Sequence, residues 1–117
     1  MKDYSFEKRK HPRVDVSEKI ACNIKIYGLT GKPVVGKVIN ISLGGVAFLS
    51  HYRDIAKAVK RPNPKVEILL PDGRSVDAMT TLLRIRPQPE SDDCVCVFRL
   101  TELNSTNSTR LQKFIIR

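Results

Sequence analysis

Two short groups of residues in the first half of the chain have the types and spacing needed to hold a nucleotide. The first contains Arg9 and Arg13, four positions apart, with Lys8 and Lys10 beside them. A guanidinium donates two parallel hydrogen bonds to phosphate oxygens or to the O6 and N7 atoms of guanine, and it also stacks on a base, whereas a lysine adds a point charge. This segment is therefore predicted to bind an anion or a guanine.

The second group reads Asn-Ile-Ser-Leu-Gly-Gly from position 40 and adds directional polar groups. The Asn40 amide can accept hydrogen bonds from the N1 or N2 donors of guanine, and the Ser42 hydroxyl can donate or accept. Because side chains alternate along a strand, we expect Asn40 and Ser42 on one face and Ile41 in the core. Gly45 allows a positive φ angle or a close backbone approach, and Gly44 can share that role.

Each group taken alone also fits a simpler structural interpretation. Arg9 and Arg13 could belong to a solvated basic arm. The second group could be a strand that ends in a turn, in which Asn40 and Ser42 bond their own backbone and glycine supplies the bend. Their occurrence together, in a chain rich in strand patterns, favours the binding interpretation.

Written as RxxxR and NxSxxG, the two groups resemble the signature motifs of the PilZ domain family, which binds the bacterial messenger cyclic di-GMP. Segments 7–9 and 100–103 are also similar to family sequence, so the likeness covers most of the chain. Family members often carry Gly-x-Arg-Phe in the last strand, where this chain has Val-Phe-Arg-Leu at 97–100. The resemblance implies ligand-binding roles for Lys8, Arg9, Lys10, Arg13, Asn40, Ser42, Gly44 and Gly45.

Alternation of apolar and polar residues predicts the strands that position these groups. A first strand is expected over residues 20–26, a second over 34–41 and a third over 46–49. Apolar residues at helical spacing then predict a short helix or turn over 51–60, before two prolines. The second group thus lies where one strand ends and the next begins.

The second half of the chain continues with strands and ends in a helix. A hairpin is predicted from strands 66–70 and 76–85 around an Asp-Gly turn, and a last strand over 94–100. Residues 108–116 have the spacing of an amphipathic helix. Strands joined by short turns, without alternating helices, predict a mainly all-β fold in the form of an antiparallel barrel.

The family resemblance implies the same architecture in more detail: a six-stranded antiparallel β-barrel with a short C-terminal α-helix. We expect one domain, because 117 residues with 41% apolar composition suffice for a single core. Within it, residues 1–14 are expected to form a flexible basic N-terminal arm, 15–103 the barrel and 104–117 the helix.

Charge and cysteine usage bound the function further. Twenty-one Lys and Arg against twelve Asp and Glu give a net charge of +9, so the surface attracts anions. No apolar run approaches the ~18 residues of a membrane span. Three cysteines with no apolar leader predict a cytoplasmic chain with reduced thiols, and the absence of CxxC spacing argues against a metal site.

These observations favour a non-enzymatic receptor in which cyclic di-GMP draws the arm against the Asn40 to Gly45 rim and the changed surface engages an unidentified downstream protein. No nucleophile–base pair or phosphate-loop motif indicates an enzyme, and no cofactor is expected. The alternatives are a PilZ-like interaction domain that binds no nucleotide, and a basic barrel that binds single-stranded nucleic acid, against which the few scattered aromatic residues argue. Arg84 and Arg99 could face the same ligand or be ordinary surface charges.

Overall fold

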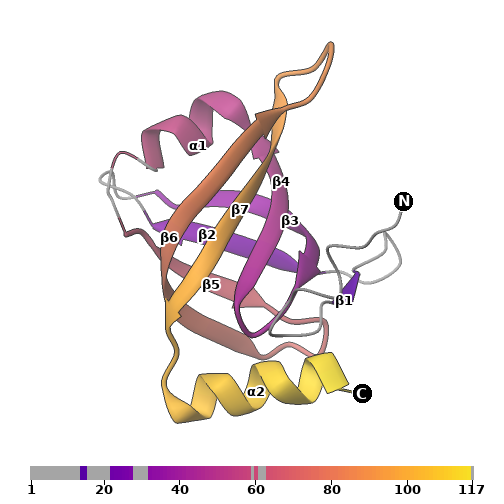
Figure 1. The fold of residues 1–117 in the computed structure, drawn as a ribbon, viewed down its shortest axis with the longest axis vertical. Helices are drawn as coiled ribbons and strands as arrows, with labels where there is room; N and C mark the ends of the chain where they lie inside the picture. Colours follow the sequence, from indigo (N-terminus) through magenta and orange to yellow (C-terminus); the bar gives the residue numbers. More distant parts are fainter. Residues whose placement is uncertain (1–13, 16–21, 28–31, 59, 61–62, 117) are drawn as a thin grey trace.

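The computed structural model describes residues 14–15, 22–27, 32–58, 60 and 63–116, and every structural statement concerns these residues. They form seven strands and two helices (Figure 1). In chain order the elements are β1 (Val14–Asp15), β2 (Asn23–Tyr27), β3 (Val34–Ile41), β4 (Gly45–His51), α1 (Tyr52–Ala58), β5 (Lys65–Leu69), β6 (Ser75–Pro87), β7 (Asp93–Glu102) and α2 (Ser105–Ile116).

The six longer strands form a closed antiparallel barrel. The order in the sheet is β1-β3-β2-β5-β6-β7-β4, and the pairing of β3 with β4 closes it. The two-residue β1 adds to the end of β3. Helix α1 lies at one end of the barrel and α2 crosses the other end (Figure 1). The predicted six-stranded barrel with a C-terminal helix is confirmed.

The barrel interior is filled by alternate residues of every long strand. Phe48 of β4 and Phe98 of β7 meet edge to face in its centre, with ring centroids 5.1 Å apart and an interplanar angle of 69°. Such an aromatic pair contributes about 0.5–1.5 kcal/mol beyond the burial of its area. Leu111 and Phe114 of α2 are buried against this core and close one end of the barrel.

The element bounds depart from the predicted ones mainly at their ends. Helix α2 begins at Ser105 rather than at residue 108, because the Asn104 side chain caps it: its Oδ1 accepts a hydrogen bond from the N–H of Asn107 at 2.8 Å. Strand β6 extends to Pro87 and strand β7 begins at Asp93, so the hairpin that they form is longer than predicted.

The N-terminal boundary also differs. Val14, predicted to end the arm, pairs with Ile41 as part of β1. Residues 1–13, which make up the rest of the predicted arm, lie outside the described residues. In the part of the chain that is described, neither helix has the length and apolar composition needed to cross a membrane.

Candidate functional site

The turn between β3 and β4 carries the second motif, and Ser42 organises it. Its Oγ accepts hydrogen bonds from the N–H groups of Gly44 at 3.1 Å and Gly45 at 3.2 Å. The Ser42 N–H in turn donates to the carbonyl oxygen of Gly45 at 2.8 Å. The residue is buried, and its hydroxyl bonds its own backbone, as the simpler interpretation expected. The hydroxyl hydrogen keeps the capacity to donate to one more acceptor.

Gly45 is required by a close approach of two strands. A Cβ at this position would lie 2.9 Å from the carbonyl oxygen of Phe98, closer than real Cβ contacts come. Its φ is not positive; among the described residues the glycine with a positive φ is Gly73, at 90° in the predicted Asp-Gly turn. We expected either a positive φ angle or a close backbone approach at this glycine, and the structure shows the close approach. The Gly44 carbonyl reinforces it by accepting the N–H of Leu100 at 3.0 Å.

Asn40 lies on the outer face of the barrel at a β-bulge. The pairing of β3 with β4 shifts between Val38 and Asn40, so Ile39 is an extra residue and Asn40 faces Ala47. Asn40 is half-buried, whereas Ile41 is fully buried in the core as predicted. A polar amide is thereby presented on the outer surface without loss of the core residue that follows it.

The first motif joins the second through β1. Val14, which directly follows Arg13 in the chain, pairs with Ile41, and Asp15 pairs with Asn40. β1, which begins at the residue after the RxxxR segment, therefore meets the second motif. Its four basic residues lie outside the described residues: Lys8, Arg9, Lys10 and Arg13.

The two later arginines lie on the same outer face as Asn40. Arg99 of β7 is the direct cross-strand partner of Gly45. Arg84 of β6 pairs with Val97 of β7, and Val97 lies in the same cross-strand row as Asn40. Both guanidinium side chains are exposed. Sequence alone left their placement open, because only the register of β6, β7 and β4 brings Arg99 beside the motif and Arg84 into the row that holds Asn40.

Charge differs between the two sides of the barrel. On the outer face of β2, β5 and β6, Lys25 lies opposite Glu67, and Glu67 opposite Asp77. The Tyr27 hydroxyl donates to Glu67 Oε1 at 3.1 Å, and this bond is the main reason that the pKa of Tyr27 is raised. Basic, acidic and polar groups are thus interleaved on this side.

The side formed by β3, β4, β7 and the end of β6 is cationic. Its exposed basic residues form no ion pair with another described residue: Lys37, Arg84, Arg86 and Arg99. Basic residues gathered on one face raise the local concentration of anions, and the acidic Asp93 on this face is paired with His51. The face that carries the second motif is therefore the one that attracts anionic ligands.

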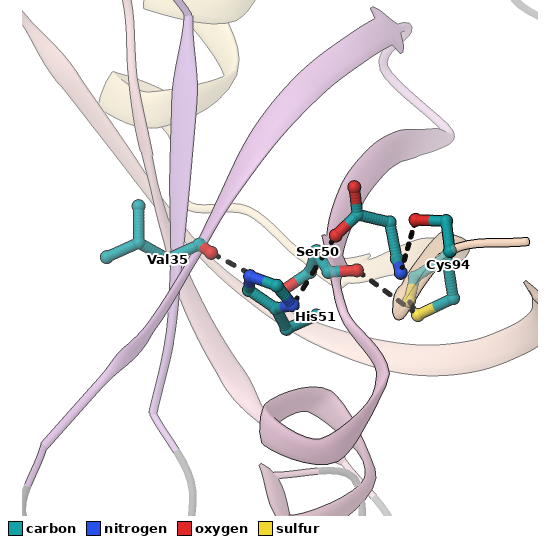
Figure 2. Close-up of polar contacts among 7 residues, drawn as sticks. Val35, Ser50, His51 and Cys94 are labelled. Carbon is teal, nitrogen blue, oxygen red and sulfur yellow. Dashed lines mark hydrogen bonds and ion pairs between the residues drawn. The ribbon is translucent and has the colours of Figure 1, made fainter. Parts of the chain in front are cut away.

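A groove of about 270 Å³ opens on this face where β3 and β4 diverge. Ser50 bridges the gap, since its Oγ donates to the Val35 carbonyl oxygen at 3.3 Å and its own carbonyl accepts the Cys94 thiol at 3.5 Å (Figure 2). At the rim, His51 Nδ1 lies 3.4 Å from Asp93 Oδ1. These contacts join β4 to β3 and to β7 at the end of the strands that lies away from the motif.

The three cysteines are free thiols in the interior. Cys94 and Cys96 lie on one face of β7 with their Sγ atoms 3.6 Å apart. Burial raises the pKa of Cys22 to about 11, and burial followed by the contact with Cys94 raises the pKa of Cys96. Thiols in this state pack as small apolar groups. No group of three metal-binding side chains occurs in the described part of the chain.

Comparison with known families identifies one match. The model of the PilZ domain matches residues 7–117, which include both motifs. No curated protein sequence matches the chain.

Solved structures share the fold at low identity. The PilZ domain of YcgR from Escherichia coli, solved with c-di-GMP, has a TM-score of 0.74 at 15% identity, over 92% of this chain and 88% of that chain. The Bacillus subtilis inhibitor of motility MotI/DgrA has a TM-score of 0.72 at 19% identity, over 94% of this chain and 50% of that chain. Borreliella burgdorferi PlzA, in complex with c-di-GMP, has a TM-score of 0.64 at 9% identity, over 92% and 51%. This chain spans about half the length of the last two proteins.

Proposed function

The chain belongs to the PilZ domain family, and from that premise we propose that it is a receptor for cyclic di-GMP. One observation carries the proposal: the strand that directly follows Arg13 pairs with β3 at Asn40 and Ile41, on the cationic face of the barrel. The residue that follows the first motif is thus paired with a residue of the second motif. Two structures that share the fold were solved with c-di-GMP, which supports the same ligand.

The residues at this place suit the two parts of the ligand. Asn40 accepts hydrogen bonds from the N1 and N2 donors of a guanine, and Ser42 holds the rim and donates its remaining hydrogen. Arg9 and Arg13, supplemented by Lys8 and Lys10, bond phosphate oxygens or the guanine edge. Arg99, opposite Gly45, adds a cation at the same end of the face.

Such a domain functions by binding cyclic di-GMP in the cytoplasm and does not catalyse a reaction. Ordering the segment that carries Arg9 and Arg13 costs about 1 kcal/mol per backbone residue, and charge-assisted contacts with the ligand offset this cost. The ligand acts as a switch to the extent that it binds the ordered state more tightly. The rearranged surface then engages a downstream protein.

Calorimetric titration with cyclic di-GMP, beside GTP and cyclic di-AMP, tests the proposal. We expect selective binding that is lost in an Arg9→Ala, Arg13→Ala double variant. The matched control is Arg53→Ala, Arg74→Ala, which removes the same charge from α1 and from the turn between β5 and β6.

Binding by the control and not by the motif variant locates the site. No heat with any nucleotide would reject the receptor and leave a PilZ-like interaction domain. Tight, salt-sensitive binding of single-stranded oligonucleotides without dinucleotide binding would instead favour a nucleic-acid-binding barrel.

A further inference from the structure

Two β-bulges lie at opposite ends of one cross-strand row on the outer face of the barrel. In β3 the extra residue is Ile39, beside Asn40. In β6 the extra residue is Leu83, beside Arg84. A bulge places two consecutive residues opposite one residue of the neighbouring strand. Ile39 is 36% exposed and Leu83 is 55% exposed, so each bulge adds an apolar side chain to the surface next to a polar one.

The two residues in the middle of this row are apolar. Ala47 of β4 pairs with Val97 of β7, and these two residues face Asn40 and Arg84 respectively. Ala47 is buried and short, and Val97 is half-buried. Neither residue has a long side chain, so a planar base can pack against the exposed part of Val97, between the two ends of the row.

The two polar ends of the row lie too far apart to bond the same atoms of a ligand. Asn40 and Arg84 are separated by three strand spacings, roughly 14 Å between their backbones at about 4.8 Å per spacing. Arg84 therefore meets the part of a ligand that extends beyond the base bonded by Asn40. A ligand with two guanines has such a part, and a mononucleotide does not.

We propose that Leu83 and Arg84 form the far wall of the ligand site and bind the second guanine of cyclic di-GMP. Leu83 packs against the base, and the Arg84 guanidinium donates to its O6 and N7 atoms. This inference rests on the proposed function and extends its site by two residues that neither motif contains. Adenine presents an N6 amino donor where guanine presents O6, so Arg84 selects guanine at this end.

Arg86 supplies a matched control. It lies two residues further along β6, is exposed on the same face, carries the same charge and pairs with Val95. It lies outside the row that holds Asn40. Removing it lowers the positive field without touching the proposed wall, and salt screens most of that field at ~0.15 M ionic strength.

The experiment compares cyclic di-GMP with the mixed ligand cyclic GMP–AMP, which keeps one guanine. Dissociation constants are measured calorimetrically for the wild type, Arg84→Ala, Arg84→Lys and Arg86→Ala. We expect Arg84→Ala to weaken cyclic di-GMP binding roughly tenfold and Arg86→Ala by less than about threefold. The preference for cyclic di-GMP over the mixed ligand is expected to fall in both Arg84 variants and to persist in Arg86→Ala.

The ratio of the dissociation constants for the two ligands distinguishes recognition of the second guanine from a general effect of charge or of folding, since the latter two change both constants alike. Equal losses in the Arg84→Ala and Arg86→Ala variants with an unchanged ratio would overturn the inference, because Arg84 would then contribute only to the field. A wild type that binds no cyclic di-GMP would overturn the proposed function, and this inference with it.

Discussion

Ser42 and Gly45 are bonded twice across the turn between β3 and β4, each donating its N–H to an oxygen of the other, at 2.8 Å and 3.2 Å. One serine hydroxyl thus fixes the residue that starts β4. Because Gly44 donates to the same oxygen, the rim of the site depends on a single side chain.

Replacing Ser42 with Ala leaves two N–H groups without their acceptor. We expect the Ser42→Ala variant to lose about 1–2 kcal/mol in the free energy of unfolding, measured by urea denaturation, and to bind cyclic di-GMP more weakly. Ser91→Ala is the control, since Ser91 Oγ accepts the N–H of Asp93 at 3.0 Å in an exposed loop where water can replace it. Equal effects of the two substitutions would contradict the role assigned to Ser42.

A methyl group at Gly45 is expected to be costly because it meets a backbone oxygen. The Gly45→Ala variant should lose about 1–3 kcal/mol of stability and most of its ligand binding, as β4 moves away from β7. The comparison is Gly73→Ala, where a Cβ meets no atom within 4 Å but the φ of 90° is strained. That variant should lose about 1 kcal/mol and bind ligand normally. Thermal unfolding and calorimetry distinguish the two.

Buried thiols predict a stability loss at alkaline pH. The folded state keeps the Cys22 proton up to a pKa of about 11, whereas the unfolded chain releases it near 9.0. The unfolded state therefore binds fewer protons between these values, and the free energy of unfolding should fall as pH rises through that window. Urea denaturation at pH 8, 9 and 10 measures the slope. A Cys22→Ala variant, although less stable, should show a smaller slope; an unchanged slope would argue against this origin.

The cap of α2 is expected to stabilise the closed end of the barrel. Asn104→Ala removes the acceptor of the Asn107 N–H and should cost about 1 kcal/mol. Thr106→Ala, an exposed position in the first turn, serves as the control and should change stability by less than about 0.5 kcal/mol. Circular dichroism during thermal unfolding measures both. A larger effect at Thr106 than at Asn104 would be inconsistent with the cap.

Local sequence patterns predict most of the helices and strands, but they do not predict the register in which neighbouring strands pair. The β-branched run at 34–41 coincides with β3, and the Asp-Gly turn forms where expected, with Asp72 Oδ1 accepting the Arg74 N–H at 2.9 Å. The bulge at Ile39 is absent from the alternation pattern, since a bulge depends on the partner strand. The start of α2 was missed because its first turn, at residues 105–108, is polar throughout.

The candidate site likewise combines features that the local sequence predicts with features that depend on strand pairing. The types and spacing of Asn40, Ser42 and Gly45 predict a site at this turn, and their binding roles stay predictions. The backbone bonding of the Ser42 hydroxyl follows from the turn, which the spacing alone left open between two interpretations. Arg84 and Arg99 are visible in the sequence as charges, but pairings between distant strands place Arg99 beside the motif and Arg84 in the row that holds Asn40.

Those pairings make the site a late product of folding. Gly45 and Arg99 are partners although more than 50 residues separate them along the chain. Contacts of such long range form slowly, because the intervening chain must first be brought into place. A nascent chain that has just emerged as far as β5 carries both signature motifs yet lacks the strands that hold them against a ligand. The proposed binding of cyclic di-GMP therefore requires that the last strand has been synthesised and the barrel has closed.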